Sequence, residues 1–179
     1  MRYFDPGIAP PLGETHHDKM ARFFGEKRAK CDSYNLLVVR LLSMAHDAKL
    51  IIALYSDDSS VRSSVITALG RRVSADLPEH TIIEFATGPA LRLALDSKQH
   101  FDLFILDGEA VPEGGLGLAR QLKDEVFNCP PVLAITGRIQ DNWLASWSKA
   151  DDVVVHPIDP FTLASKVAGL LQTKTVATA

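Results

Sequence analysis

Short apolar runs alternate, from Lys49 onward, with segments in which apolar residues recur every three or four positions. The runs have the length and content of buried strands and fall at residues 50–55, 81–86, 103–106, 132–135 and 153–155. Residues typical of helix starts follow four of them: Ser59 or Ser60, Thr87-Gly88-Pro89, Asp141 or Asn142, and Asp159-Pro160. Strict alternation of strands and helices predicts a parallel sheet covered on both faces, a doubly wound α/β domain of the (βα)5 type. We expect this domain over residues 49–172, with a short polar tail over residues 173–179.

The first 48 residues have a different character. Prolines, glycines and mixed charges dominate them, and little of this can build a core, so we expect a disordered extension. An over-extended translation start is the alternative, because Met44 stands just before the ordered region. The histidines and Cys31 in this part have spacings that match no structural zinc site.

Composition restricts the classes of protein. The chain has 179 residues, 46% of them hydrophobic, and a formal net charge of −3, which gives no basic surface for direct contact with nucleic acid. Two cysteines exclude a disulfide framework. No apolar run approaches the roughly 18 residues that a membrane span needs, so we expect no membrane insertion and a cytoplasmic location.

Polar residues follow four of the predicted strands where each one ends. Asp107 ends the run FDLFILD, Asp57 and Asp58 follow the first strand, Thr136 follows the fourth and His156 the fifth. In open α/β sheets the chemistry lies outside the carboxyl ends of the strands, so we expect these side chains to lie close together. Asp57 as a helix cap and Thr136 as an ordinary strand-end residue are the structural alternatives.

Four segments resemble the receiver domain of two-component response regulators: SDDSSVR, FDLFILD, AITGR and ADDVVVHPID. The resemblance covers about residues 49–171. It implies the flavodoxin-like receiver fold with strand order 2-1-3-4-5, a phospho-acceptor at Asp107, and a role in phosphorelay signal transduction rather than in metabolism as an enzyme. A histidine kinase or another phosphodonor is the partner that it implies.

The chemistry of such a site needs a divalent cation, because an acceptor carboxylate and a phosphoryl group bring several negative oxygens together. Mg²⁺ suits hard oxygen ligands. We expect Asp107 to be nucleophile and metal ligand, with Asp57 and the backbone carbonyl of Glu109 as further ligands. Asp58 is the substitute for a second acid that this sequence lacks before Asp57. Thr136 and His156 would then bind the phosphoryl oxygens.

Several residues depart from the family pattern. Alignment on Arg62 places Ser56 and Asp57 where two acids usually stand, so we expect weaker metal binding. His156 replaces the usual lysine and is largely neutral at pH 7 unless phosphate raises its pKa. Val153 replaces the usual aromatic, and the Glu109 side chain adds negative charge beside the site.

Partner surfaces are expected on the fourth helix or the last helix. Trp143 and Trp147 are four residues apart and share one side of the fourth helix, where they fit either a core face or an interface. Residues after Leu171 are too few for a DNA-binding output domain, so we expect a stand-alone, atypical receiver that acts through protein contacts. The segments DGEAVPEGG, CPP and WLASWS are also similar to those of orphan regulators associated with the respiratory NADH dehydrogenase. That similarity implies the alternative, a pseudo-receiver that serves as adaptor or accessory subunit without phosphorylation.

Overall fold

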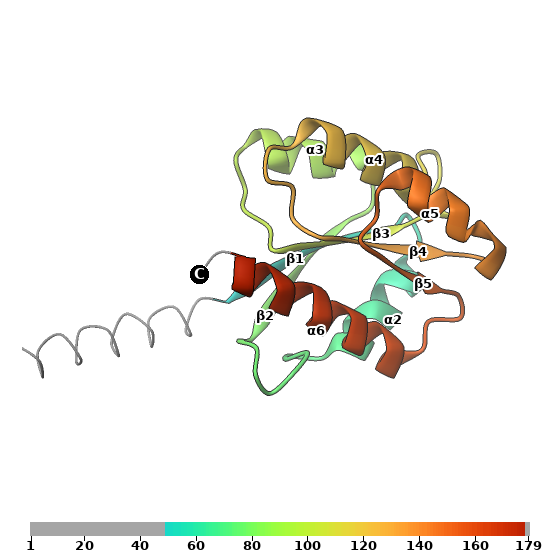
Figure 1. Ribbon diagram of the computed structural model, residues 1–179. Coiled ribbons are helices and arrows are strands. Elements are labelled where there is room, and N and C mark those ends of the chain that lie inside the picture. The colour runs from blue at the N-terminus through green and yellow to red at the C-terminus, as the bar shows by residue number, and fades with distance from the viewer. Residues whose placement is uncertain (1–48, 178–179) are drawn as a thin grey trace, which may run out of the picture. The chain divides into compact units, whose positions relative to one another are not determined.

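The computed structural model describes residues 49–177 of the chain (Figure 1). The predicted extension over residues 1–48, including the alternative start at Met44, lies outside the described residues.

Five strands form one parallel sheet, as the apolar runs predict. They are β1 (Leu50–Tyr55), β2 (His80–Phe85), β3 (Leu103–Asp107), β4 (Val132–Thr136) and β5 (Asp152–Val155). Their order in the sheet is β2-β1-β3-β4-β5, which confirms the doubly wound topology that the receiver resemblance implies. The chain therefore reverses its winding direction between β1 and β3, where such sheets place their functional groups.

The helices alternate with the strands. They are α2 (Ser59–Leu69), α3 (Gly88–Asp96), α4 (Gly115–Glu125), α5 (Asn142–Ser148) and α6 (Pro160–Ala177), with a 3₁₀ turn, η1 (Ile139–Asp141), before α5. Two ends differ from the sequence prediction. Asp58, rather than Ser59 or Ser60, caps α2, and α6 continues past Leu171 to Ala177, through most of the predicted tail. The short polar residues at the end of α6 carry no helix breaker, so nothing local stops the helix at Leu171.

Helices cover both faces of the sheet, with α2 and α6 on one face and α3, α4 and α5 on the other (Figure 1). Alternate residues of the central strands face the two layers. Leu103 and Ile105 join the cluster beneath α2 and α6, whereas Phe104 and Leu106 join the cluster beneath α3 and α4. All residues of β3 and β4 are buried, so the strands that carry Asp107 and Thr136 are the most enclosed part of the sheet.

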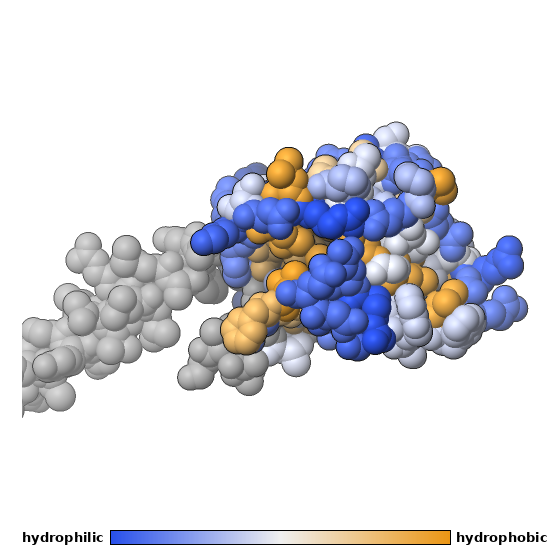
Figure 2. Space-filling view, turned by 90° about the horizontal axis from the view of Figure 1, so that it is seen from above, coloured by the Kyte–Doolittle hydropathy of each residue, from blue (hydrophilic) through white to orange (hydrophobic). Residues whose placement is uncertain are grey.

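The surface seen from the side of α3, α4 and α5 is mostly hydrophilic, with hydrophobic patches between the polar residues (Figure 2). Trp143 and Trp147 on α5 are 67% and 53% exposed, so the interpretation of the pair as core residues is wrong. Among residues 49–177, no helix has the length and apolar content that crossing a membrane requires.

Candidate functional site

The carboxyl ends of four strands bring Ser56 and three of the predicted site residues to one edge of the sheet. Ser56 follows β1, Asp107 ends β3, Thr136 ends β4 and His156 follows β5. Asp107 lies opposite Ile135 in the register, and the His156 N–H donates to the carbonyl of Thr136 over 2.9 Å. The parallel pairing of neighbouring strands, rather than any side-chain attraction, therefore fixes the order in which these groups stand.

Asp107 is enclosed and has two hydrogen-bond donors. Its residue is only 2% exposed. The Ser56 hydroxyl donates to Oδ2 over 2.7 Å, and the backbone N–H of Glu109 donates to Oδ1 over 3.0 Å. A buried carboxylate needs such donors to offset the loss of water. Ser56 thus supplies a hydrogen bond at the position where the receiver pattern has an acid.

Thr136 has a buried hydroxyl that makes no hydrogen bond within residues 49–177. The residue is 1% exposed, and its Oγ1 has no hydrogen-bond partner among the described residues. A buried hydroxyl without a partner costs about 1–3 kcal/mol. It is therefore a donor free to bind an acceptor that arrives at the end of β4.

The two acids after β1 have different surroundings. The Asp58 carboxylate accepts a 2.7 Å hydrogen bond from the backbone N–H of Ser60, which caps α2 and lowers the pKa of that carboxyl. Asp57 is exposed, and its carbonyl, together with that of Ser56, accepts from the Arg62 guanidinium. Arg62 also pairs with Glu84 on β2 over 2.9 Å, so the loop that carries both acids is held in place.

The donor set does not fit a tightly held magnesium ion. Residues 49–177 contain no group of three or more His, Cys, Asp or Glu side chains arranged to hold a metal. Ser56 occupies one oxygen of Asp107, and the Asp58 carboxylate is used as a helix cap. Mg²⁺ at Asp57, Asp58, Asp107 and the backbone carbonyl of Glu109 stays a prediction.

The side chain of Glu109 has a role that the sequence did not reveal. Its Oε1 accepts a 3.2 Å hydrogen bond from the backbone N–H of Gly137, the residue after Thr136. The sequence predicts only that the Glu109 carbonyl is a metal ligand and that its side chain adds negative charge beside the site. The two segments are 28 positions apart in the chain, so no local pattern signals the contact.

Three further residues fix the loop between β3 and α4. Tyr55 is fully buried, and its hydroxyl donates to the carbonyl of Glu113 over 2.5 Å. Burial and the neighbouring Glu113 charge raise the pKa of Tyr55. Arg92 on α3 binds both oxygens of Glu113, at 2.7 and 2.8 Å, and lowers the pKa of that carboxyl. The loop after Asp107 is thus tied to β1 and α3.

Two glycines permit close approach beside this loop, Gly115 at the start of α4 and Gly88 at the start of α3. A Cβ on Gly115 would lie 2.3 Å from the carbonyl oxygen of Asp107, so a larger residue there would displace the backbone next to Asp107. A Cβ on Gly88 would lie 2.0 Å from the Glu113 carboxylate, so a larger residue there would displace that side chain.

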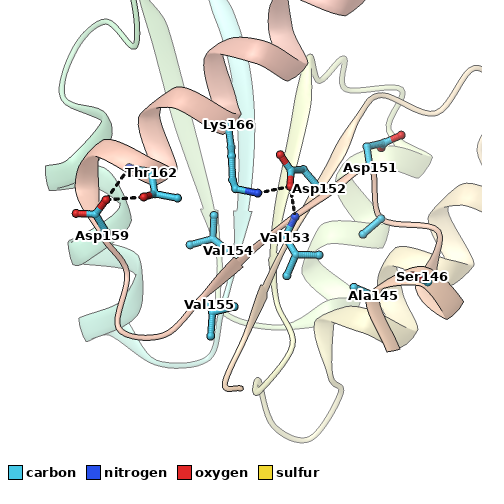
Figure 3. A pocket seen from close by; sticks show the side chains of 11 residues that line it. Ala145, Ser146, Asp151, Asp152, Val153, Val154, Val155, Asp159, Thr162 and Lys166 are labelled. Carbon is cyan, nitrogen blue, oxygen red and sulfur yellow. Dashed lines mark hydrogen bonds and ion pairs between the residues drawn. The ribbon is translucent and has the colours of Figure 1, made fainter. Parts of the chain in front are cut away.

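A groove of about 630 Å³ runs along β5 between α5 and α6 (Figure 3). Val153, Val154 and Val155 of β5 line it, Lys166 pairs with Asp152, and Asp159 accepts hydrogen bonds from Thr162. Its lining includes none of Ser56, Asp107 and Thr136, so the groove is separate from the strand-end cluster.

A doubly wound five-stranded sheet with an enclosed aspartate at the end of its third strand is typical of receiver domains. Comparison with known proteins leads to the same class. An uncharacterized response regulatory protein of Mycobacterium tuberculosis, found in strains CDC 1551 / Oshkosh and ATCC 25618 / H37Rv, is 51% identical over 123 residues, which are 69% of this chain and 92% of that protein. The chain belongs to the response regulator family.

Solved structures show the same fold. The receiver domain of Francisella response regulator 1452 matches with a TM-score of 0.60 at 15% identity, over 70% of this chain and 99% of that one. The response regulator DrrB of Thermotoga maritima matches with a TM-score of 0.57 at 22% identity, over 71% of this chain, which spans 54% of DrrB. No family model matches the sequence. Receiver domains in general bind Mg²⁺ at the phosphorylation site and interact with histidine kinases and other proteins.

Proposed function

We propose that the chain is an atypical receiver of a two-component phosphorelay that accepts a phosphoryl group on Asp107 and acts through protein contacts. The single observation that carries the proposal is the buried Thr136 hydroxyl, which has no hydrogen-bond partner in the part of the chain that the structure describes and lies at the end of β4, next to the strand of Asp107. A phosphoryl oxygen is the acceptor that would satisfy it.

The proposed step forms a bond between a carboxylate oxygen of Asp107 and phosphorus. The bond from phosphorus to the ring nitrogen of a kinase phosphohistidine, or to the acyl oxygen of an acyl phosphate, breaks, and its electron pair leaves with that nitrogen or oxygen. Ser56 and Glu109 each donate one hydrogen bond to an oxygen of Asp107, and each oxygen keeps a further lone pair for the attack. The site lacks the second acid of the family pattern, and we expect slow phosphorylation in consequence.

The test uses the purified full chain, acetyl phosphate and Mg²⁺, with intact mass as the readout. We expect a single phosphate adduct, absent from Asp107→Asn and retained in Asp76→Asn, which removes an exposed carboxylate after α2. Failure of wild type to form any adduct, with acetyl phosphate or with beryllofluoride, removes phosphorylation from the proposal.

A second candidate is an adaptor whose contacts do not depend on phosphorylation, such as an accessory subunit of a larger complex like the respiratory NADH dehydrogenase. The hydrogen bond from Ser56 to Asp107 supports it, because it already satisfies the acceptor. The exposed Trp143 and Trp147 support it as well, since aromatic side chains concentrate at interfaces.

Native affinity purification separates the two candidates. The adaptor predicts stoichiometric recovery of a large complex that Asp107→Asn leaves unchanged and that Trp143→Ala with Trp147→Ala abolishes. Phe127→Ala is the matched control, because Phe127 is 91% exposed and lies in the turn after α4 rather than on α5. Loss of the complex in Asp107→Asn alone would favour the phosphorelay.

A further inference from the structure

Glu109 joins the acceptor strand to the loop that follows the neighbouring strand. Its backbone N–H donates to Oδ1 of Asp107 over 3.0 Å, and its side-chain Oε1 accepts from the N–H of Gly137 over 3.2 Å. A single residue therefore spans the distance from the acceptor to the position after Thr136.

Gly137 provides the space for this contact. A Cβ at position 137 would lie 2.9 Å from Oε1 of Glu109 and 3.0 Å from its Cδ. Side-chain carbons do not normally approach so closely, so any other residue at 137 would push the carboxylate away.

A phosphoryl group on Asp107 would need donors at the same edge of the sheet. Thr136 offers a hydroxyl without a partner among the described residues, and the adjacent residue offers a backbone N–H that Glu109 already holds. A carboxylate oxygen and a phosphoryl oxygen are both anionic acceptors. They compete for one N–H, and two anions close together also repel each other.

Building on the proposed phosphorylation of Asp107, we infer that the Glu109 carboxylate is an internal competitor of the phosphoryl group. It holds the Gly137 N–H in the resting protein and has to release it before a phosphoryl oxygen binds there. Glu109 thereby limits how much acyl phosphate accumulates on Asp107.

The variants separate competition for the N–H from simple charge repulsion. Glu109→Asp keeps the charge but is one methylene too short, and Gly137→Ala keeps Glu109 but pushes its carboxylate away. Each is expected to raise adduct formation with acetyl phosphate roughly three- to tenfold, the size of effect that one typical intramolecular hydrogen bond has. Glu125→Gln, which removes an exposed charge on α4, is expected to have no effect. A rise in Glu109→Gln without one in Glu109→Asp means that charge alone acts, and overturns the inference.

A double variant and an amide resonance complete the test. Glu109→Ala combined with Gly137→Ala is expected to form no more adduct than either alone, because both remove one contact. Without any phosphodonor, the Gly137 amide proton of the ¹⁵N-labelled full chain should move upfield in Glu109→Ala, and an unchanged resonance overturns the inference. Equal adduct in wild type and all variants, with none in Asp107→Asn, refutes the competitor but keeps the proposed function. No adduct in any protein refutes both.

Discussion

The Ser56 hydroxyl donates a 2.7 Å hydrogen bond to Oδ2 of the buried Asp107, at the position where receivers carry an acid. One carboxylate of the family site is thereby exchanged for a neutral donor. The exchange lowers the negative charge around Asp107 and satisfies one of its oxygens without a metal ion. We therefore expect Ser56 to stabilise the fold and at the same time to slow phosphorylation.

Ser56→Ala is expected to destabilise the fold by about 1–3 kcal/mol, because Oδ2 of Asp107 then stays buried without a donor. Urea unfolding measures the change. Ser59→Ala is the control, since Ser59 is an exposed residue at the start of α2. Equal stability of Ser56→Ala and wild type would mean that the hydrogen bond contributes nothing.

Ser56→Asp is expected to favour metal binding and phosphorylation. A second carboxylate beside Asp107 restores the acid pair of the family pattern and should raise the apparent affinity for Mg²⁺ and the rate of adduct formation at least several-fold. Without Mg²⁺ the same variant should unfold at lower urea than wild type, because two close carboxylates repel. Titration of Mg²⁺ by fluorescence of Trp143 and Trp147 measures the affinity, and a variant no better than wild type would show that Ser56 is not what limits metal binding.

Thr136→Val is expected to separate stability from function. It replaces a hydroxyl that has no partner within residues 49–177 by a methyl group of similar shape, so the free energy of unfolding should stay equal or rise by about 1 kcal/mol. Adduct formation with acetyl phosphate should fall, whereas Thr136→Ser should retain it. A large loss of stability in Thr136→Val would mean that the hydroxyl has a partner in solution.

Tyr55→Phe tests the anchoring of the loop after Asp107. The Tyr55 hydroxyl donates to the carbonyl of Glu113 over 2.5 Å inside the core. Its loss is expected to destabilise the protein by about 1 kcal/mol and to speed hydrogen exchange in the loop before α4, with little change around α6. Uniform exchange throughout the domain would argue against a local anchor.

The sequence predicts the strands and the sheet order well because buried parallel strands read as continuous apolar runs, and the receiver motifs supply the order. It places Asp107 and Thr136 correctly at strand ends for the same reason. The contact of Glu109 with Gly137 and the hydrogen bond of Tyr55 to Glu113 depend on the packing of distant segments, which no local periodicity encodes. The interpretation of Trp143 and Trp147 as core residues is wrong because helical spacing tells which residues share a face but not which face is buried.

His80 at the start of β2 gives the protein a dependence on pH that is separate from the site. Both ring nitrogens are buried without hydrogen-bond partners among the described residues. Burial lowers the pKa of His80 below its usual 6.5, against the opposing effects of the Gly70 backbone and Glu79. The unfolded chain therefore binds the proton more readily than the folded one.

The contribution of His80 to stability is then expected to be greatest above pH 6.5, where His80 is neutral in both states, and to fall as the pH drops from 6.5 toward the folded pKa. One proton gives a slope of at most about 1.4 kcal/mol per pH unit. His80→Phe removes the titration and should flatten this part of the stability profile measured by urea unfolding between pH 5 and 7. If the variant and wild type lose stability in parallel over this range, the loss comes from other groups. A His80 ring titration by NMR with a midpoint at or above 6.5 would likewise contradict the prediction.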